Sequence, residues 1–191
     1  PLLASQRDAL ERARGALIHT YECGGKVLLC GNGGSAADCD HIAGELLKGF
    51  ASKRELTGAL RAAMGESLAQ RLQMGLPAVS LPAQGAIISA FCNDVAAQTV
   101  YAQLTLALAK PGDVLWCIST SGNSENVVLA ARAAKALGVS VIAMVGKQSC
   151  ALDALADVVL HAPATETYRV QEYHLPMYHW LCAEVENDFF D

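Results

Sequence analysis

Two short segments of the sequence gather small residues that can bind an anion or a sugar. The first, Gly31-Asn32-Gly33-Gly34-Ser35, follows an apolar run, and its glycines let the backbone approach a ligand closely. The second, Ser119-Thr120-Ser121-Gly122-Asn123-Ser124, follows another apolar run and supplies four hydroxyl groups. Each segment precedes a predicted helix, whose first N–H groups are unpaired and favour an anion. The two segments therefore predict a phosphate or sugar site that needs no lysine or arginine.

Two other interpretations of these segments are less consistent with the sequence. The first also fits the dinucleotide-binding pattern G-x-G-x-x-A, from Gly31 to Ala36. That pattern needs a second strand that ends in an acidic residue about 20 residues further on, whereas residues 48–52 form no predicted strand. The second segment has more hydroxyls than a helix cap needs. No G-x-x-x-x-G-K-[ST] pattern occurs, which excludes a Walker-type NTPase.

Acid–base and metal-binding side chains occur on two predicted helices. His41 and Glu45, four residues apart, share one helix face. Near the C-terminus, Gln171 and His179 lie about 80° apart around an ideal helix, so both can face one broad cavity. Pro176 lies between them and is expected to kink the helix, which would bring them closer. Imidazole and carboxylate groups transfer protons and also bind divalent metals.

The remaining histidines are interpreted differently. His19 and His161 are predicted to be packing residues. His174 stays undecided between a packing residue and a site residue, because it shares a helix face with Tyr178 next to the candidate site.

The order of apolar runs predicts the elements that position these residues. Buried strands are expected at 26–30, 78–81, 114–119, 140–145 and 158–161. Helical patterns occur at 36–48, 85–91, 95–109 and 125–137, with further helices at the N-terminus and at about 168–190. Strands that alternate with helices predict a parallel sheet covered on both faces.

The domain organisation follows from this alternation. We expect one α/β domain over 1–191, a three-layer sandwich with a five-stranded parallel sheet and extra N- and C-terminal helices. Residues 49–76 contain no clear strand and are predicted to be a long connection with helical parts, acting as a flap or a subunit contact.

The composition narrows the class of protein. Hydrophobic residues make up 52% of the 191 residues and charged residues 17%, so we expect subunits to cover apolar surface by association. A net charge of −5 argues against nucleic-acid binding. The seven cysteines form no C-x-x-C pair and include several in apolar runs, which indicates buried thiols in a reducing compartment. No membrane span or signal peptide is predicted, and we expect a cytoplasmic protein.

Taken in chain order, these residues resemble the sedoheptulose-7-phosphate isomerases (phosphoheptose isomerases) of the sugar isomerase (SIS) superfamily. The resemblance rests on Gly31-Asn32-Gly33-Gly34-Ser35-Ala36-Ala37-Asp38 with His41 and Glu45, on Asn93-Asp94, on 119–124, and on Gln171-Glu172-x-His174 with His179. It covers most of the chain. The chain departs from the family at two places. Family members have an acidic residue three positions before the glutamine, where this chain has Tyr168, and the segment around Pro176 also differs.

The resemblance implies a flavodoxin-like SIS fold, assembled as a homotetramer with sites near subunit boundaries. It implies a phosphate site formed by Ser119, Thr120, Ser121 and Ser124, and a sugar site lined by Asn32, Gly33, Gly34, Asn93, Asp94 and Gln171. It also implies a divalent metal, zinc in the enzymes compared, held by His41, Glu45, Gln171 and His179. Glu45 and His179 would be the acid–base pair.

The expected activity is isomerisation of sedoheptulose 7-phosphate to a heptose 7-phosphate through an enediol, with Glu45 as base and His179 as acid. A residue that coordinates a metal is a poorer base. Either the ligands exchange during turnover, or the metal is structural and Glu45 acts free. The alternative function is a non-catalytic SIS protein that senses a phosphosugar or binds a partner. The expected partners are a small sugar phosphate and further copies of this chain, with no nucleic acid and no membrane.

Overall fold

The computed structural model of the protein describes residues 4–190. The strands are β1 (Val27–Gly31), β2 (Ala78–Ser80), β3 (Val114–Ile118), β4 (Ser140–Val145) and β5 (Val158–His161). The helices are α1 (Arg7–Glu22), α2 (Gly34–Leu47), α3 (Gly58–Met64), α4 (Glu66–Ala69), α5 (Gly85–Phe91), α6 (Val100–Leu108), α7 (Glu125–Ala136) and α8 (Thr167–Phe190). Short 3₁₀ turns occur at Ala4–Gln6, Ala97–Thr99 and Ala151–Ala154, and a π-helical turn at Cys92–Ala96.

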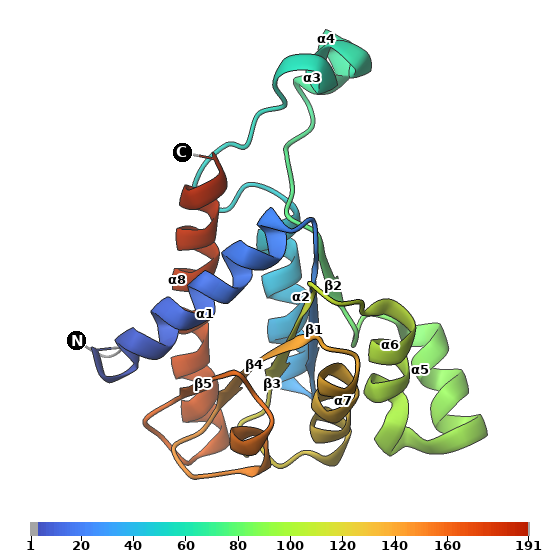
Figure 1. Ribbon diagram of the computed structural model, residues 1–191, viewed down its shortest axis with the longest axis vertical. Helices are drawn as coiled ribbons and strands as arrows, with labels where there is room; N and C mark the ends of the chain where they lie inside the picture. The colour runs from blue at the N-terminus through green and yellow to red at the C-terminus, as the bar shows by residue number, and fades with distance from the viewer. Residues whose placement is uncertain (1–3, 191) are drawn as a thin grey trace.

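The five strands form one parallel sheet in the order β2-β1-β3-β4-β5 (Figure 1). The neighbours β1 and β3 are paired from Val27 with Val114 to Gly31 with Ile118. They therefore end at the same edge of the sheet, and the two donor-rich segments that follow them are brought side by side. The predicted α/β class with a five-stranded parallel sheet is confirmed.

The sheet has an apolar layer on each face because successive strand residues point to opposite sides. Leu29 faces the side covered by α1, α2 and α8, where it packs in one cluster with Ile42 and Leu181. Leu28 faces the opposite side, in a cluster that contains Tyr101 of α6 and Val127 of α7. This arrangement is the predicted three-layer sandwich.

The predicted elements are found with small changes in their bounds. The helix predicted over 95–109 begins only at Val100, because the π-helical and 3₁₀ turns at Cys92–Ala96 and Ala97–Thr99 precede it. The helix predicted to begin at residue 36 already begins at Gly34. Within residues 4–190, no helix combines the length and apolarity needed to cross a bilayer.

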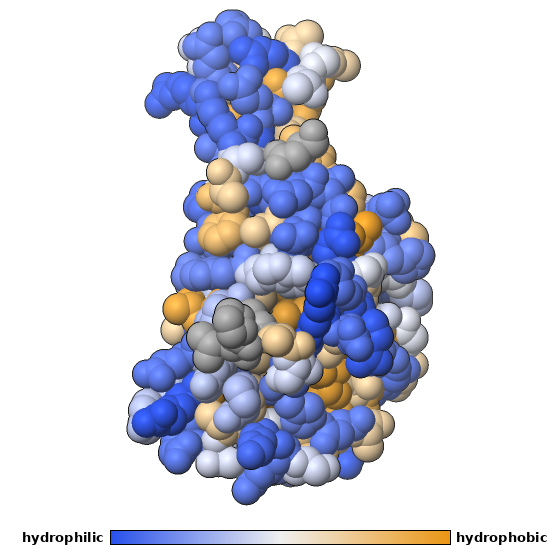
Figure 2. All heavy atoms as spheres, turned by 90° about the vertical axis from the view of Figure 1, so that its left-hand side faces the viewer, coloured by the Kyte–Doolittle hydropathy of each residue, from blue (hydrophilic) through white to orange (hydrophobic). Residues whose placement is uncertain are grey.

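An arm, defined here as residues 55–73, leaves the body between α2 and β2. An isolated antiparallel bridge from Glu55 to Gln73 closes its base, and α3 and α4 form its tip (Figure 1). Leu60 and Leu68 are 42% and 50% exposed, although the face of the arm seen in Figure 2 is largely hydrophilic. The predicted helical parts are confirmed, and the role as flap or subunit contact stays a prediction.

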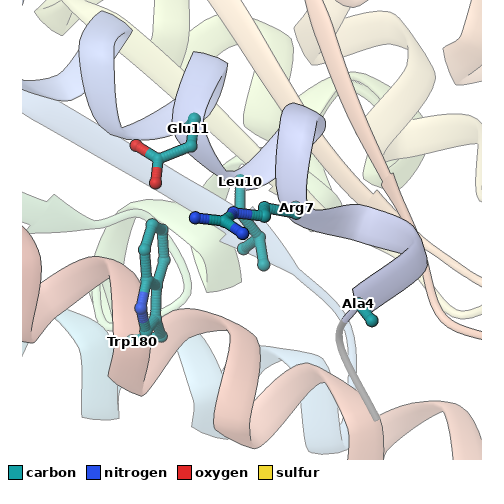
Figure 3. A pocket seen from close by; sticks show the side chains of 5 residues that line it. All are labelled: Ala4, Arg7, Leu10, Glu11 and Trp180. Atoms are coloured by element: carbon teal, nitrogen blue, oxygen red, sulfur yellow. The ribbon is translucent and has the colours of Figure 1, made fainter. Parts of the chain in front are cut away.

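An open cavity of about 320 Å³ lies between α1 and α8 (Figure 3). It is lined by Ala4, Arg7, Leu10, Glu11 and Trp180. None of the predicted site residues lines it. The side chains of α8 that matter for the site face α2 instead.

A buried ion pair ties α8 to the end of α2. Arg54 and Glu186 have fully buried side chains and are joined by a 2.7 Å hydrogen bond from Arg54 Nε. Arg54 also donates to the carbonyl oxygens of Leu46 and Glu45, at 2.6 and 3.2 Å. The two oxygens of Glu186 accept further hydrogen bonds from the backbone N–H groups of residues 50–52. One charge pair thus fixes α2, the following loop and α8 relative to one another.

We predict that Glu186→Ala is strongly destabilising. The substitution leaves the Arg54 guanidinium buried without its counter-charge, which costs about 3–5 kcal/mol. Asp188→Ala is the matched control, since Asp188 on the same helix pairs with the partly exposed Arg14 at 2.6 Å, and such pairs contribute less than about 1 kcal/mol. Urea unfolding of both variants measures the two losses. Similar losses would show that the Arg54–Glu186 pair is not a principal anchor.

Candidate active site

The first donor-rich segment turns tightly between β1 and α2. Gly33 has a φ of +55°, a conformation that favours glycine. At Gly34 a Cβ atom would collide with the side-chain amide of Gln171. The lack of a side chain therefore lets Gln171 of α8 lie directly against the beginning of α2.

The second donor-rich segment forms a compact turn between β3 and α7. Ser119 Oγ accepts a hydrogen bond from the Gly122 N–H at 3.2 Å and lies 3.1 Å from Ser124 Oγ. Asn32 and Asn126 exchange two amide hydrogen bonds of 2.9 Å, which join the first segment to the beginning of α7. The hydroxyls and the beginning of α7 therefore face the first segment.

A cavity of about 270 Å³ lies between these segments at the carboxyl edge of the sheet. Its lining consists of Asn32, Gly33, Gly34, Ser35, Ile118, Ser119, Thr120, Ser124, Thr167 and Gln171. The lining contains no carboxylate and no ammonium or guanidinium group. Hydroxyls, amides and the N–H groups at two helix beginnings can therefore bind an anion here with neutral donors.

The structure divides the predicted phosphate-binding hydroxyls between two cavities. Ser121 lines a second, smaller cavity of about 150 Å³ together with Asn123 and Lys147. Thr120 and Thr167 line both cavities and separate them. The four hydroxyls do not all face the same space.

Asn93 and Asp94 do not line the cavity that the other predicted sugar-binding residues share. They lie in the exposed π-helical turn after α5, where Asn93 Nδ2 donates to Asp94 Oδ1 at 2.8 Å. Because α5 follows β2 at the edge of the sheet, this turn is one strand away from the donor segments. Within one chain, the structure leaves these two residues outside the site.

A separate polar cluster lies where α2 packs against α8. His41 Nε2 is 3.2 Å from Glu45 Oε1, and the rings of His41 and His179 are 5.1 Å apart. Lys48 Nζ holds the other oxygen of Glu45 at 2.8 Å. His41 therefore lies beside His179, and Glu45 lies beside His41.

The surroundings set the charge states in this cluster. Partial burial alone would raise the pKa of Glu45, but the hydrogen bond and charge of Lys48, with help from His41, lower it below its usual range. Burial, reinforced by the neighbouring His41, lowers the pKa of His179. At neutral pH the pair is therefore a carboxylate and a neutral imidazole.

Two members of the cluster were not predicted from the sequence. The Tyr178 hydroxyl lies 3.0 Å from His41 Nδ1 and 3.3 Å from Asp38 Oδ1. Burial raises the pKa of Asp38, partly offset by the hydrogen bond from Tyr178. Asp38, His41 and Glu45 recur every three to four residues, a pattern that could have placed Asp38 on the face of α2 that carries the other two.

Gln171 lies away from the predicted metal ligands. It contacts Gly34, whereas His179, eight residues further along α8, contacts His41; eight residues span about 12 Å of helix. α8 runs as one helix through Pro176, and the expected approach of Gln171 to His179 does not occur. His174 is a buried packing residue: its Nε2 faces the Val145 carbonyl at 3.2 Å, and burial lowers its pKa to about 4.

The side-chain types of the cluster suit a metal ion, but their arrangement does not. Two imidazoles and a carboxylate are ligands that suit zinc, and His179 Nε2 is buried without a hydrogen-bond partner among residues 4–190. In the same residues, however, no three His, Cys, Asp or Glu side chains are arranged to hold one ion. Glu45 is paired with Lys48, and Gln171 lines the cavity at the carboxyl edge of the sheet.

Comparison with known proteins assigns the chain to a family. A family model described as SIS domain matches residues 2–67 and 59–146. The phosphoheptose isomerase of Crocosphaera subtropica is 40% identical over 182 residues, which cover 95% of this chain and 83% of that protein. The chain belongs to the SIS-domain family of phosphoheptose isomerases.

Solved structures agree with this assignment. The phosphoheptose isomerase of Neisseria gonorrhoeae superimposes with a TM-score of 0.80 at 32% identity, covering 95% of this chain and 87% of that chain. The enzyme from Francisella tularensis gives a TM-score of 0.79 at 30% identity, covering 96% and 87%. The resemblance read from the motifs is confirmed.

We predict that two glycine substitutions in the donor segments differ in cost. Gly33→Ala meets open space, so it adds only the strain of a sparsely populated backbone conformation, about 1–3 kcal/mol. Gly122→Ala also has a positive φ, +64°, and its Cβ would in addition collide with Cys150, which adds about 1–3 kcal/mol of overpacking. Chemical denaturation of the two variants measures the difference. Equal losses of unfolding free energy would mean that Cys150 moves aside without cost.

Proposed function

We propose that the chain is a phosphoheptose isomerase that converts sedoheptulose 7-phosphate to an aldose heptose 7-phosphate. The observation that carries this proposal is that a member of this family keeps a carboxylate and two imidazoles together, at Glu45, His41 and His179. The neutral anion cavity in the same chain supports a phosphorylated substrate.

The phosphate binds in the cavity between the two donor segments. Ser119 and Ser124 supply hydroxyls, and the beginning of α7 supplies N–H groups and a favourable dipole. The Asn32–Asn126 pair holds the first segment against the beginning of α7. Binding by fixed, neutral donors suits a phosphate that must be held but does not react.

The isomerisation needs a base at C1 and a group that moves a proton between two oxygens. The Glu45 carboxylate removes a proton from C1, and the electron pair of that bond forms the C1–C2 double bond of the enediol. Neutral His179 donates its proton to the oxygen on C2 and takes one from the hydroxyl on C1. Glu45 then returns its proton to C2, which completes the aldose. Proton transfer by positioned groups contributes about 10²–10⁴-fold to the rate.

We propose that a divalent metal, zinc by chemistry, would be held by His41, Glu45 and His179, whose side chains would have to move closer together to bind it. Such a metal would supply positive charge close to the developing negative charge of the substrate oxygen. The donor types and the unpartnered His179 Nε2 support this proposal.

We expect Glu45→Gln to fold normally and lose turnover. The amide keeps the shape of the side chain but cannot accept the C1 proton, so kcat should fall by about 10²–10⁴-fold. Conversion of sedoheptulose 7-phosphate is the measurement, with thermal unfolding as the control for folding. A variant with near-normal kcat would remove Glu45 from the mechanism.

The two halves of the site are proposed to come from neighbouring chains of a homotetramer. α2 begins at the phosphate cavity, and Glu45 lies eleven residues along it, about 16 Å away along the helix axis. His41 is nonetheless exposed on its outer side, with 43% of its side chain accessible. Exposed apolar side chains on the arm, such as Leu60 and Leu68, support subunit contacts.

Mixed assemblies test this composite site. Co-expression of Glu45→Gln chains with Ser119→Ala/Ser124→Ala chains should restore activity above that of either variant, because some interfaces then contain two intact halves. The control mixes Glu45→Gln with His179→Gln chains, whose defects lie in the same cluster and cannot complement. Absence of recovery in the first mixture would place the complete site within one chain.

A cytoplasmic location is also proposed. All seven cysteines lie within the described residues and are free thiols. Cys30 Sγ and Cys117 Sγ lie 3.7 Å apart in the core without forming a disulfide. Free, neighbouring thiols are consistent with a reducing compartment.

A further inference from the structure

The proposed reaction does not use the smaller of the two cavities beside the donor-rich turn. This Lys147 cavity has a volume of about 150 Å³ and lies between the turn that follows β3, the turn that follows β4 and the segment between β5 and α8. Its lining consists of hydroxyl, amide and backbone groups with one charged side chain, that of Lys147, and it includes no carboxylate. A cavity with one positive charge and no negative charge suits an anionic ligand.

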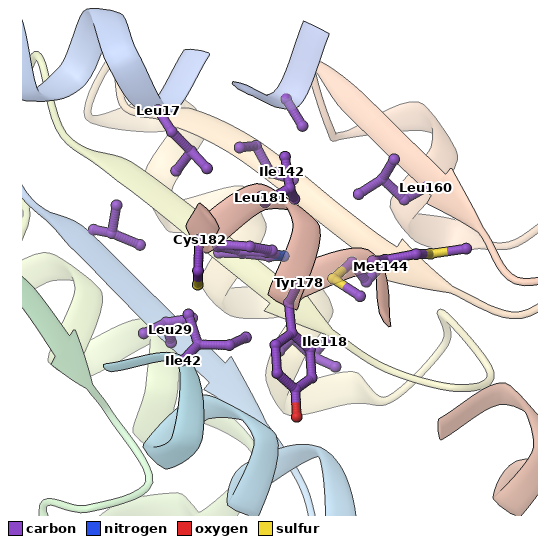
Figure 4. Close-up of a cluster of buried hydrophobic side chains, with 14 of the residues drawn as sticks. Leu17, Leu29, Ile42, Ile118, Ile142, Met144, Leu160, Tyr178, Leu181 and Cys182 are labelled. Carbon is purple, nitrogen blue, oxygen red and sulfur yellow. The ribbon is translucent and has the colours of Figure 1, made fainter. Parts of the chain in front are cut away.

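Backbone hydrogen bonds hold the walls of the Lys147 cavity in place. β3 ends at Ile118, whose side chain is buried in the apolar cluster shown in Figure 4. Beyond that strand, the Thr120 carbonyl oxygen accepts a hydrogen bond from the Gly146 N–H at 3.1 Å. On the other side, the Lys147 N–H donates to the Ala164 carbonyl oxygen at 2.9 Å. The three segments that surround the cavity are therefore joined to one another before any ligand binds.

Several donors in this cavity have no partner within the protein. Ser121 Oγ accepts a hydrogen bond from the Asn123 N–H at 3.2 Å, which leaves the hydroxyl proton of Ser121 free to donate. Among residues 4–190, the hydroxyls of Thr120 and Thr167 form no hydrogen bond, and the ammonium group of Lys147 forms no ion pair. A phosphate in this cavity would therefore meet unused hydroxyl donors and a free ammonium group.

Positive charge also exceeds negative charge around the mouth of the cavity. Lys147 lines a third, open cavity of about 340 Å³ together with Arg169 and Glu166. The Arg169 guanidinium lies over the ring of Tyr168, 5.7 Å from the ring centroid. Two cations and one carboxylate leave this side of the molecule attractive to an anion.

The Lys147 cavity and the larger cavity at the carboxyl edge of the sheet are neighbours. Thr120 and Thr167 line both of them, and Thr167 is exposed, so one small molecule can extend across these two side chains. The larger cavity offers only neutral donors, whereas the Lys147 cavity adds an ammonium group. Two neighbouring spaces that each suit an anion indicate a ligand with two anionic groups.

We propose that the Lys147 cavity is a second anion subsite, which takes the second phosphate of a sugar bisphosphate whose first phosphate lies in the larger cavity. This inference rests on the proposed function, which places the first phosphate there. The substrate of the proposed reaction carries a single phosphate. A sugar bisphosphate is therefore an inhibitor that competes with this substrate for the larger cavity.

Two ligands that differ by one phosphate group test the subsite. Sedoheptulose 7-phosphate and sedoheptulose 1,7-bisphosphate are titrated separately into the full chain by calorimetry, and the ratio of their dissociation constants is the readout. We expect the wild type to bind the bisphosphate about tenfold more tightly, because one added hydrogen bond between charged groups changes affinity by about this factor.

Substitutions show which cavity holds which phosphate. Lys147→Gln removes the ammonium charge and should abolish the preference for the bisphosphate. Lys110→Gln is the matched control, since Lys110 is also exposed and free of ion pairs within residues 4–190 but precedes β3, at the opposite edge of the sheet. It should keep the preference although the net charge changes equally. Ser119→Ala/Ser124→Ala should weaken both ligands, and thermal unfolding of every variant identifies folding defects.

Inorganic phosphate distinguishes a linked second phosphate from a free anion. It is titrated into protein that is already saturated with sedoheptulose 7-phosphate. We expect no binding at concentrations at which the bisphosphate saturates the protein, because only a linked group gains from a high effective concentration. Binding of inorganic phosphate as tight as that of the bisphosphate, and lost in Lys147→Gln, would identify a site for a free anion and overturn the bisphosphate assignment.

The remaining outcomes separate this inference from the proposed function. If the wild type shows no preference for the bisphosphate, or if Lys147→Gln keeps it, the second subsite is wrong even when the protein isomerises its substrate. If the preference is lost in Lys147→Gln and kept in Lys110→Gln but no isomerisation is measured, the proposed activity fails and the subsite stands. If neither sugar phosphate binds the wild type, the subsite and the proposed phosphate cavity are rejected together.

Discussion

The side-by-side packing of α2 and α8 is the constraint on which the polar cluster depends. The two helices run in the same direction, from the contact of Gly34 with Gln171 to the anchor of Arg54 on Glu186. A buried ion pair contributes little net stability, because the desolvation of two charges offsets most of their attraction. Here it also satisfies the last carbonyls of α2 and the N–H groups of the next loop. Its specific effect is to fix the register in which Glu45 faces His179.

The two polar regions use opposite electrostatic means. The cavity at the carboxyl edge of the sheet offers N–H groups and hydroxyls to an anion, and these donors need no counter-charge and keep their geometry without a flexible side chain. The cluster between α2 and α8 instead contains titratable groups whose pKa values move down, at Glu45 because of Lys48 and at His179 because of burial and His41. The proposed reaction, in which a phosphate stays unchanged while a carbon loses a proton, requires these different environments.

The sequence predicted what local patterns determine. Five apolar runs between turn residues predicted the five strands. The glycines and hydroxyls that follow two of these runs predicted the cavity, because a parallel sheet brings the carboxyl ends of its strands to one edge. The sequence did not predict the contact of Tyr178 with Asp38, which lies 140 residues away along the chain. Nor did it predict that Ser121 faces a separate cavity, because this depends on how the turn at Gly122 folds against Cys150. The expected approach of Gln171 to His179 failed because α8 continues through Pro176.

The separation of the two regions has one geometric cause. A helix that leaves the carboxyl edge of a sheet runs back along it, and each residue adds about 1.5 Å. His41 and Glu45 are therefore carried away from the donor segments by the helix that begins there, and no rotation of their side chains recovers that distance. The same geometry leaves His41 exposed, whereas Glu45 is mostly buried beside it. A residue that must meet a substrate, but is carried outward by its own helix, is in reach of a neighbouring chain, and this is the physical reason for proposing a site shared between two chains.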